Sequence, residues 1–394
     1  MTVDASSTRV RTVLLHRKHR GPSVWWHNAV VLPIGPALDG EALANLLHLG
    51  QCASSLGVDA VHVELSTADV VRDRRLALFV ASTHEHSLKV LVTLPGAAIP
   101  VDASTLDVME GVTTLLGRIR ACRAAGADGV DLAEIPDPAS IATPDGQARY
   151  AQRFTDLVQV LLAEVSGEDD SPILTASSAT TSVDVLRHQL EDNWFHHLRD
   201  TFLNHTAWDG PSIARTLRQA YELRDPIGQV TAWSWSASEN DAAASPQTGY
   251  DDNARLLASL ALPGSVYLAS GIPVAQCSPL EAQASALGGG TTRVAMLREA
   301  TRLRRERDMG TGSLAIVDGL EWAPDGVLVM IVSGIMVVLN TTSTDIEVPS
   351  QHLPLLTSAA PRHRSAVSFT LPAHSCGWFE TARVQAAPTP FDYA

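Results

Sequence analysis

The chain has 394 residues, of which 45% are hydrophobic and 18% are charged, and its formal net charge is −14 at pH 7. A chain of this length and hydrophobic content buries a large core, which predicts a barrel-sized domain followed by a smaller one. The negative charge argues against nucleic acid and anionic membranes as general partners, because the field of the whole molecule repels phosphate groups.

Cysteine usage points to a reducing compartment. The four cysteines, Cys52, Cys122, Cys277 and Cys376, form no Cys-x-x-Cys pair and lie in or beside apolar runs. Reduced thiols pack in this way as small hydrophobic groups, so we expect a cytoplasmic protein. We identify no signal peptide and no apolar run of about 18 residues, so we predict neither secretion nor a membrane span.

Residues 1–22 are predicted to form a basic N-terminal arm. The basic run His16-Arg-Lys-His-Arg20 follows the apolar Val13-Leu14-Leu15 in an otherwise acidic chain. Such a run is either a solvated arm or a docking element for an acidic partner or an anionic surface. The residues alone leave both interpretations open.

Residues 23–308 alternate short β-branched runs with helical patterns, which is typical of a parallel α/β fold. Seven strands are predicted, over Ala29–Leu32, Ala60–Leu65, Lys89–Thr93, Gly129–Leu132, Pro172–Thr175, Gln229–Ser234 and Ser265–Leu268. The predicted helices span Glu41–Leu56, Leu106–Ala125, Tyr150–Val165, Ile213–Arg224 and Asn253–Leu262. This rhythm predicts a (β/α)8 TIM barrel whose remaining, weakly marked strand lies near Phe195–Leu203.

After a helix over Thr292–Arg307, closely spaced strands predict a small antiparallel β-sandwich domain over residues 309–381. The strands are expected at Ser313–Val317, Val327–Val332, Ile335–Leu339, Asp345–Val348, Ala366–Leu371 and Gly377–Glu380. Residues 382–394 are rich in Ala and Pro and are predicted to be a flexible tail.

Several motifs follow one another in the order and at the spacing of one enzyme family. They are Trp25-Trp-His-Asn-Ala-Val-Val-Leu-Pro-Ile-Gly-Pro36, Leu56-Gly-Val-Asp-Ala-Val61, Gly126-Ala-Asp-Gly-Val-Asp-Leu-Ala-Glu134, Leu262-Pro-Gly-Ser-Val-Tyr267 and Leu303-Arg-Arg-Glu-Arg307. In these motifs residues 23–381 resemble the α-amylase/α-glucosidase superfamily of glycoside hydrolases. The resemblance implies a TIM barrel followed by a β domain.

The positions that carry the chemistry of that family lack its carboxylates. The resemblance places Asp131 at the position of the family's Arg, Ala133 at the nucleophile and Ser177 at the general acid. The family's Asn-His-Asp motif corresponds to Ser236, Ala237 and Ser238. The family's domain B is missing between Pro95 and Gly126. A degenerate barrel without domain B is similar in architecture to the heavy-chain ectodomains of heteromeric amino-acid transporters, where it serves as a partner-binding body.

These substitutions predict a protein without glucosidase activity. Retaining glycosidases use two carboxylates about 5 Å apart, one as the nucleophile and one as the general acid. The side chains of Ala and Ser can perform neither role. We therefore expect a pseudoenzyme without cofactor or metal that binds a protein partner or forms a homo-oligomer. Residual saccharide binding is compatible with this expectation.

Two alternatives belong to other function classes. Strand alternation places His62, Glu64 and Asp131 at the barrel mouth, where they form either a relocated acidic site of a carbohydrate-active enzyme or a structural polar cluster. Trp233 and Trp235 share one face of a strand. Together with Trp194, they either stack a sugar ring in a sugar-binding sensor or pack in the core.

The remaining candidates favour structural roles. His84-x-His86 and His196-His197 have no further ligand at a recognisable spacing, so we expect surface or helix-cap histidines rather than a metal site. Gly288-Gly-Gly290 precedes a predicted helix, where an anion can bind, but no Lys-Ser/Thr pair follows it. We therefore expect a plain loop there.

Overall fold

The structure of the chain is a computed structural model that describes residues 10–47, 49–66, 73–94, 105–141, 143–165, 172–191, 194–235, 248–268, 293–349, 351–360 and 368–381. Within these residues, no helix combines the length and the hydropathy needed to cross a bilayer.

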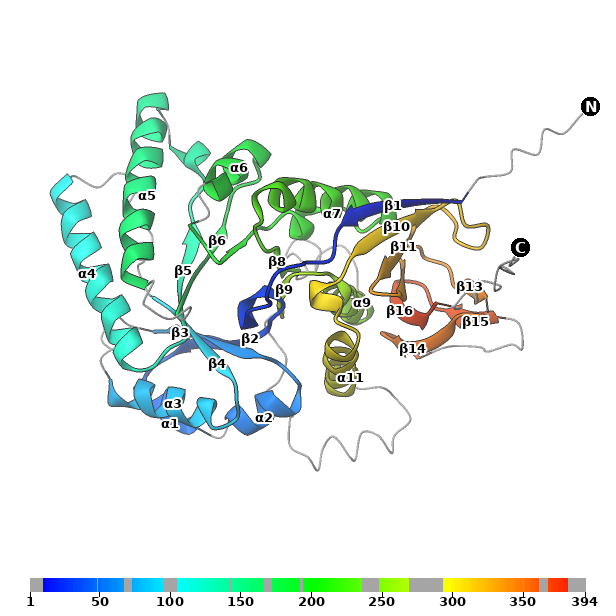
Figure 1. The fold of residues 1–394 in the computed structure, drawn as a ribbon, viewed down its shortest axis with the longest axis horizontal. Helices are drawn as coiled ribbons and strands as arrows, with labels where there is room; N and C mark the ends of the chain where they lie inside the picture. Colours follow the sequence, from blue (N-terminus) through cyan, green and yellow to red (C-terminus); the bar gives the residue numbers. More distant parts are fainter. Residues whose placement is uncertain are drawn as a thin grey trace, which may run out of the picture.

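Eight parallel strands close into a barrel in sequence order (Figure 1). The strands are β2 (Val30–Leu38), β3 (Ala60–Leu65), β4 (Lys89–Thr93), β5 (Gly129–Ile135), β6 (Ile173–Ser178), β7 (His197–Arg199), β8 (Ala232–Ser234) and β9 (Ser265–Tyr267). The predicted (β/α)8 barrel is therefore confirmed. Its weakly marked strand is β7, which has only three residues and lies inside the predicted range.

Helices surround the barrel. They are α1 (Gly40–Asn45), α2 (Leu49–Ser55), α3 (Arg74–His84), α4 (Thr105–Ala124), α5 (Pro144–Val165), α6 (Val183–Glu191), α7 (Gly210–Arg224), α9 (Thr248–Ala261) and α11 (Arg293–Glu306). The prediction of one helix over Glu41–Leu56 was wrong, because the chain leaves the helical path after Asn45 and forms two short helices. Helices α3 and α6 were not predicted.

The C-terminal domain contains an antiparallel sheet in the order β1-β10-β11-β12-β16-β14 and a two-stranded sheet, β13-β15. Its strands after the barrel are β10 (Leu314–Asp318), β11 (Val327–Val332), β12 (Ile335–Asn340), β13 (Ile346–Pro349), β14 (Leu353–Thr357), β15 (Ser368–Leu371) and β16 (Ser375–Glu380). The predicted antiparallel β domain is confirmed, and strand β14 was not predicted.

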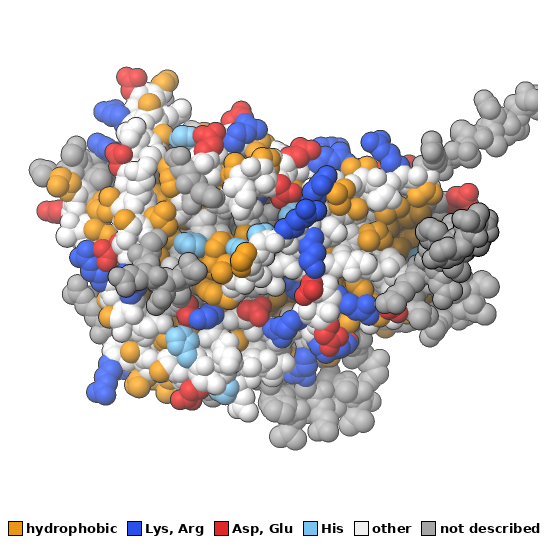
Figure 2. All heavy atoms as spheres, viewed as in Figure 1, with side chains coloured by type: hydrophobic (Ala, Val, Ile, Leu, Met, Phe, Trp, Pro, Cys, Tyr) orange, Lys and Arg blue, Asp and Glu red, His pale blue; other side chains and the backbone are white. Residues whose placement is uncertain are grey.

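The first strand of the chain belongs to this last domain. Strand β1 (Arg11–His16) pairs antiparallel with β10, with Arg11 opposite Asp318 and Leu14 opposite Ala315. The prediction of a separate arm over residues 1–22 therefore missed a long-range strand pairing that the local sequence does not encode. The basic residues after β1 cross from this sheet to the barrel, and Lys and Arg side chains lie over that connection (Figure 2).

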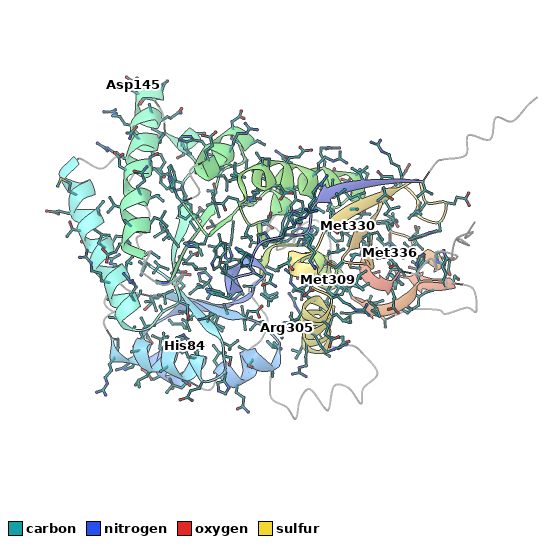
Figure 3. All side chains as sticks on the ribbon, in the orientation of Figure 1. His84, Asp145, Arg305, Met309, Met330 and Met336 are labelled. Atoms are coloured by element: carbon teal, nitrogen blue, oxygen red, sulfur yellow. The ribbon has the colours of Figure 1, made fainter. Side chains whose placement is uncertain are left out.

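Hydrophobic packing joins the two domains. Met330 in β11 belongs to the large core that also fills the space between the barrel and its helices. Met336 in the neighbouring strand β12 belongs to a separate core of the β domain. Both methionines, together with Met309 in the short 3-10 helix that follows α11, are marked in Figure 3. Arg305, also marked there, joins α11 to the start of β3 through an ion pair of 2.9 Å with Asp59.

Candidate functional site

The interior of the barrel is filled in two layers. The lower layer is apolar, and Trp25 and Trp26, which form a 3-10 helix with His27, pack against it from below. Its members are Ala29, Val31, Ala60, Leu91, Ile173, Ala232 and Tyr267. Polar side chains occupy the strand positions above this layer, near the carboxyl ends where barrel enzymes place their catalytic groups.

Asp131 of β5 lies at the centre of the polar layer and has no exposed surface. Its Oδ2 accepts hydrogen bonds from Arg199 Nη1 at 2.7 Å and from Thr175 Oγ1 at 2.6 Å. Its Oδ1 accepts one from the backbone N–H of Ala133 at 2.8 Å. Burial alone would raise the pKa of Asp131, but Arg199, His62 and these hydrogen bonds outweigh burial and hold the pKa well below its usual range.

Arg199 is the functional counterpart that the sequence analysis missed. It comes from the three-residue strand β7, is 7% exposed, and its guanidinium carbon lies 4.4 Å from the centroid of the Tyr267 ring. The resemblance puts Asp131 where the related enzymes have an Arg, and here an Arg reaches the same place from another strand. Arg199 therefore supplies the counter-charge of Asp131 from another strand of the barrel.

His62 adjoins this ion pair as a neutral ring. Its Nε2 lies 2.6 Å from Thr93 Oγ1 and 3.8 Å from Asp131 Oδ1. Burial lowers the pKa of His62 to about 4, although Asp131 opposes that shift. At neutral pH His62 is therefore a hydrogen-bonding group rather than a second cation beside Asp131.

His197 connects the polar layer with the base of the barrel. Its Nε2 is 2.6 Å from the Trp26 carbonyl oxygen, and its Nδ1 is 2.9 Å from the Tyr267 hydroxyl. Because a carbonyl only accepts, Nε2 carries the proton and Nδ1 accepts from Tyr267. Burial lowers the pKa of His197 to about 3 and raises that of Tyr267 to about 12, so both groups stay neutral.

Ala133, at the position of the family's nucleophile, sits in a β-bulge. Its φ of 59° lies in the left-handed region, and the register between β5 and β6 shifts by one residue after Asp131. As a result Glu134, not Ala133, lies opposite Ser177. Ser177 Oγ donates to the Ala133 carbonyl at 3.1 Å.

The bulge brings an unpredicted carboxylate to the mouth. Thr175 contacts Asp131 inside the barrel, and Ser177 follows two residues later on the same face. Glu134, which pairs in register with Ser177, shares this inward side and is exposed. Strict alternation along Gly129–Glu134 would turn Glu134 outward, and no residue type in this stretch marks the bulge in advance.

The predicted trio of His62, Glu64 and Asp131 is only partly assembled. His62 and Asp131 approach each other. Glu64 is exposed, and strand β4 separates it from Asp131, because Thr93 of β4 pairs in register with both residues. The trio therefore combines one buried, neutralised carboxylate with one carboxylate at the surface.

The tryptophans predicted as a sugar platform face the helices instead. Trp233 and Trp235 are buried in the core between the barrel and its helices. Trp233 Nε1 donates to the Pro263 carbonyl at 2.7 Å, and the Trp235 ring lies 5.9 Å from that of Trp208. Trp194 is buried in the same core. Of the two interpretations left open by the sequence, the structure therefore agrees with core packing, because Trp233 in β8 and Trp235 directly after it share the face turned toward the helices.

The other candidate histidines have structural partners. His84, marked in Figure 3, has its Nε2 2.6 Å from Asp128 Oδ2. The other oxygen of this carboxylate, Oδ1, accepts a hydrogen bond from Lys89 Nζ at 2.7 Å. His196 Nδ1 accepts from the backbone N–H of Leu174 at 3.1 Å. In the described part of the chain, no group of three or more His, Cys, Asp or Glu residues is arranged to hold a metal ion.

Several sequence candidates lie outside the described residues. They are Cys277, the triplet Ser236, Ala237 and Ser238, and the glycine run 288–290.

Comparisons with known proteins identify the fold. No protein-family model and no curated protein matches the sequence. Among solved structures, an α-amylase from H. orenii superposes with a TM-score of 0.60 at 12% identity over 90% of this chain and 99% of that one.

Two further structures give the same result. A maltogenic α-amylase from Thermotoga neapolitana has a TM-score of 0.54 at 11% identity over 90% of this chain and 97% of the other. The type III pullulan hydrolase from Thermococcus kodakarensis has a TM-score of 0.51 at 12% identity over 91% and 83%. The chain therefore has the same barrel-plus-β-domain fold as these α-amylase and pullulan hydrolase structures.

Proposed function

We propose that this chain is a non-catalytic relative of the α-glucosidases whose barrel and β domain bind a protein partner. The observation that carries the proposal is the state of Asp131, the buried carboxylate two residues before the position that the resemblance assigns to the nucleophile. Both of its oxygens accept hydrogen bonds, and Arg199 neutralises its charge in a site without solvent contact. A carboxylate held in this way supports the fold and reaches no substrate.

The neighbouring positions support the same conclusion. Ala133 has no functional group, and Ser177 Oγ is bound to the carbonyl of Ala133. Hydrolysis of a glycosidic bond needs one carboxylate to attack or to activate water and a second to protonate the leaving oxygen. Because catalytic groups act as a unit, the loss of both removes most of the rate acceleration.

Exposed apolar side chains on the helical layer support a role in partner binding. Leu78 of α3, Met109 of α4 and Val160 of α5 are 52%, 63% and 45% exposed. Hydrophobic side chains along α5 are visible in Figure 2. Contiguous exposed apolar patches mark protein interaction sites, so these side chains are the positions to test for a partner.

The catalytic part of the proposal is tested with a nitrophenyl α-glucoside. We expect no turnover above the buffer rate for the natural chain. We expect the same for the double variant A133D/S177E, because the bulge holds residue 133 in a left-handed conformation. Turnover that remains through purification to a single species would contradict the proposal.

The partner is tested by affinity capture of the tagged chain from its native host, followed by mass spectrometry. We expect a protein that is enriched over background and is lost with the surface variant M109D/V160D. A matched control variant, R215Q/R218Q, alters exposed residues of α7 and should retain the partner. Recovery of nothing above background, together with saccharide binding in calorimetry, would favour a sugar-binding protein instead.

One observation favours a second candidate function. Glu134 and Glu64 are both exposed near the carboxyl ends of β5 and β3, so the mouth carries two carboxylates that a relocated glycosidase site would need. If such a site operates, Glu64→Gln and Glu134→Gln each abolish the turnover of the natural chain without lowering its stability. This result would replace the pseudoenzyme by a carbohydrate-active enzyme.

A further inference from the structure

The amino-terminal end of the barrel, opposite the mouth, contains an open groove of about 660 Å³. One side is the end of β1 and the basic run that follows it, residues 14–20. The other side is the base of the barrel, which includes Tyr221 of α7, Asp225 and the loop segments 228–231 and 263–264. The groove therefore lies where the strand from the β domain passes under the barrel.

The groove is strongly basic although the chain as a whole is acidic. Six basic side chains line it, namely His16, Arg17, Lys18, His19, Arg20 and His27. One acidic side chain, Asp225, lines it with them, and its carboxylate lies 2.9 Å from His16 Nδ1. Among the described residues, Lys18 forms one ion pair, a long and exposed contact of 3.8 Å with Asp308.

Arg17 and Arg20 keep their charges available. Both are exposed, and neither forms an ion pair with a carboxylate of the described residues. Next to them, His27 Nδ1 is buried and forms no hydrogen bond within the described part of the chain. Burial, followed by the proximity of His19 and His196, lowers the pKa of His27, which favours its neutral ring.

The walls of the groove are held in place by ring stacking and by a backbone hydrogen bond. The His16 ring stacks on Tyr221 with centroids 4.6 Å apart, and the backbone N–H of His19 donates to the Thr311 carbonyl at 3.1 Å. Gly228, with a φ of 71°, makes the turn that leads from α7 back to β8. A ligand therefore meets a preformed site, and less conformational entropy is lost on binding.

We propose that this groove binds a short acidic peptide segment of a partner protein, an inference that specifies the partner-binding function proposed above. Carboxylates of the peptide pair with Arg17 and Arg20, since Arg forms paired hydrogen bonds with carboxylates. Leu14 and Leu15 also line the groove, and Leu14 is 51% exposed, so an apolar side chain of the peptide has a surface to cover.

The negative net charge of the molecule disfavours the binding of a long polyanion more than that of a short acidic peptide. A membrane or a nucleic acid presents many negative charges to the entire surface, and the net charge of −14 opposes its approach. A peptide of a few residues stays inside the groove, where Arg17, Lys18 and Arg20 supply a local positive charge. Screening limits the repulsion from the rest of the molecule to about 8 Å at physiological salt.

The experiment is a titration of the purified full-length chain against the fluorescein-labelled peptide Glu-Glu-Asp-Leu-Glu-Glu, followed by fluorescence anisotropy. The matched probe replaces every acidic residue by Gln or Asn. We expect saturable binding of the acidic peptide only, with a Kd that increases with salt and increases about tenfold or more in the variant R17Q/R20Q. The control R215Q/R218Q removes the same charge outside the groove and should bind as the natural chain does.

Three outcomes would overturn the inference: no binding of the acidic peptide, equal binding of the neutral peptide, or equal weakening by R215Q/R218Q. Co-sedimentation with phosphatidylserine vesicles without peptide binding would also overturn it, in favour of a membrane surface. Thermal unfolding followed by circular dichroism checks that R17Q/R20Q remains folded. Glucosidase turnover would contradict the proposed function but would leave the peptide result intact, so the two failures are distinguishable.

Discussion

The two ends of the barrel use charge in opposite ways. At the mouth, Asp131 and Arg199 form a buried pair within 2.7 Å, and each is surrounded by groups that match its charge or polarity. At the base, Arg17 and Arg20 are exposed beside an open groove. The difference is one of burial: the charges at the mouth are paired inside the barrel, whereas those at the base are exposed to solvent.

The comparison also separates stability from binding. A buried charge without a counter-charge strongly destabilises the folded state, whereas ion pairs at the surface contribute little to the free energy of unfolding. Substitutions at the mouth should therefore change the free energy of unfolding, and substitutions at the base should change ligand affinity alone. The following predictions test this separation.

The largest effect is expected from Arg199→Met. This change leaves Asp131 buried with no counter-charge, which typically costs about 3 to 5 kcal/mol. Urea denaturation followed by circular dichroism measures the loss. The double variant D131N/R199M should recover much of it, because no unpaired charge then remains. A loss below about 1 kcal/mol for the single variant would mean that the pair is solvated and that the mouth is not a closed structural core.

Acidification should destabilise the mouth through its histidines. The pKa of His62 is lowered to about 4 and that of His197 to about 3, while both titrate near 6.5 in the unfolded chain. Between these values the unfolded chain binds more protons, so the free energy of unfolding decreases as the pH falls below about 6.5. From pH 7.5 to 5 the expected loss is about 4 kcal/mol, roughly 2 for each histidine, measured by denaturation at each pH.

Asp131 affects the free energy of unfolding at lower pH than the histidines do. Its pKa is lowered, so its stabilising contribution persists above the unfolded value of about 3.9 and decreases only when the pH falls further. His197→Gln should flatten the pH dependence between pH 6.5 and 5, and D131N should not. Stability that does not change between pH 7.5 and 5 would show that the two rings are accessible to solvent.

A smaller gain is expected from Ala133→Gly. The φ of 59° is costly for a residue with a Cβ, so glycine should stabilise the fold by about 1 kcal/mol. Ala176 in the neighbouring strand β6 is a control, because its replacement by glycine in a regular strand should destabilise the fold by about 1 kcal/mol. Melting temperatures that decrease in both variants would argue against the bulge.

The smallest effect is expected at the base. The pair of His16 and Asp225 is partly exposed, with side chains 20% and 34% accessible, so Asp225→Asn should cost less than about 1 kcal/mol. The same denaturation series as for R199M gives the comparison. A cost as large as that of R199M would place the base in the folding core and would remove the contrast between the two ends.

Much of the barrel was predictable because its strands are marked locally. Runs such as Ala60–Leu65 and Lys89–Thr93 carry β-branched and apolar residues at every position that packs against helices, and both were predicted with their observed bounds. Strand β7 was marked only weakly, since a three-residue strand contains too few positions to show a period. Arg199, which this strand delivers to Asp131, was missed for the same reason.

The orientation of side chains was harder to predict than the elements. The sequence placed Trp233 and Trp235 on one face of a strand, but only the closed barrel decides that this face turns toward the helices. Alternation along β5 likewise failed after Asp131, because the bulge at Ala133 moves Glu134 into the inward register. A single extra residue changes which side chains face the mouth, and its cause lies in the pairing with β6.

By itself, the sequence determined the (β/α)8 barrel, the following β domain and the absence of carboxylates at Ala133 and Ser177, since periodicity and residue identity are local properties. Only the tertiary structure decided that Arg199 neutralises Asp131, that β1 crosses to β10 and that a basic groove forms beneath the barrel. Each of these features joins residues far apart in the chain, and their energies depend on burial and on distances that no local pattern contains.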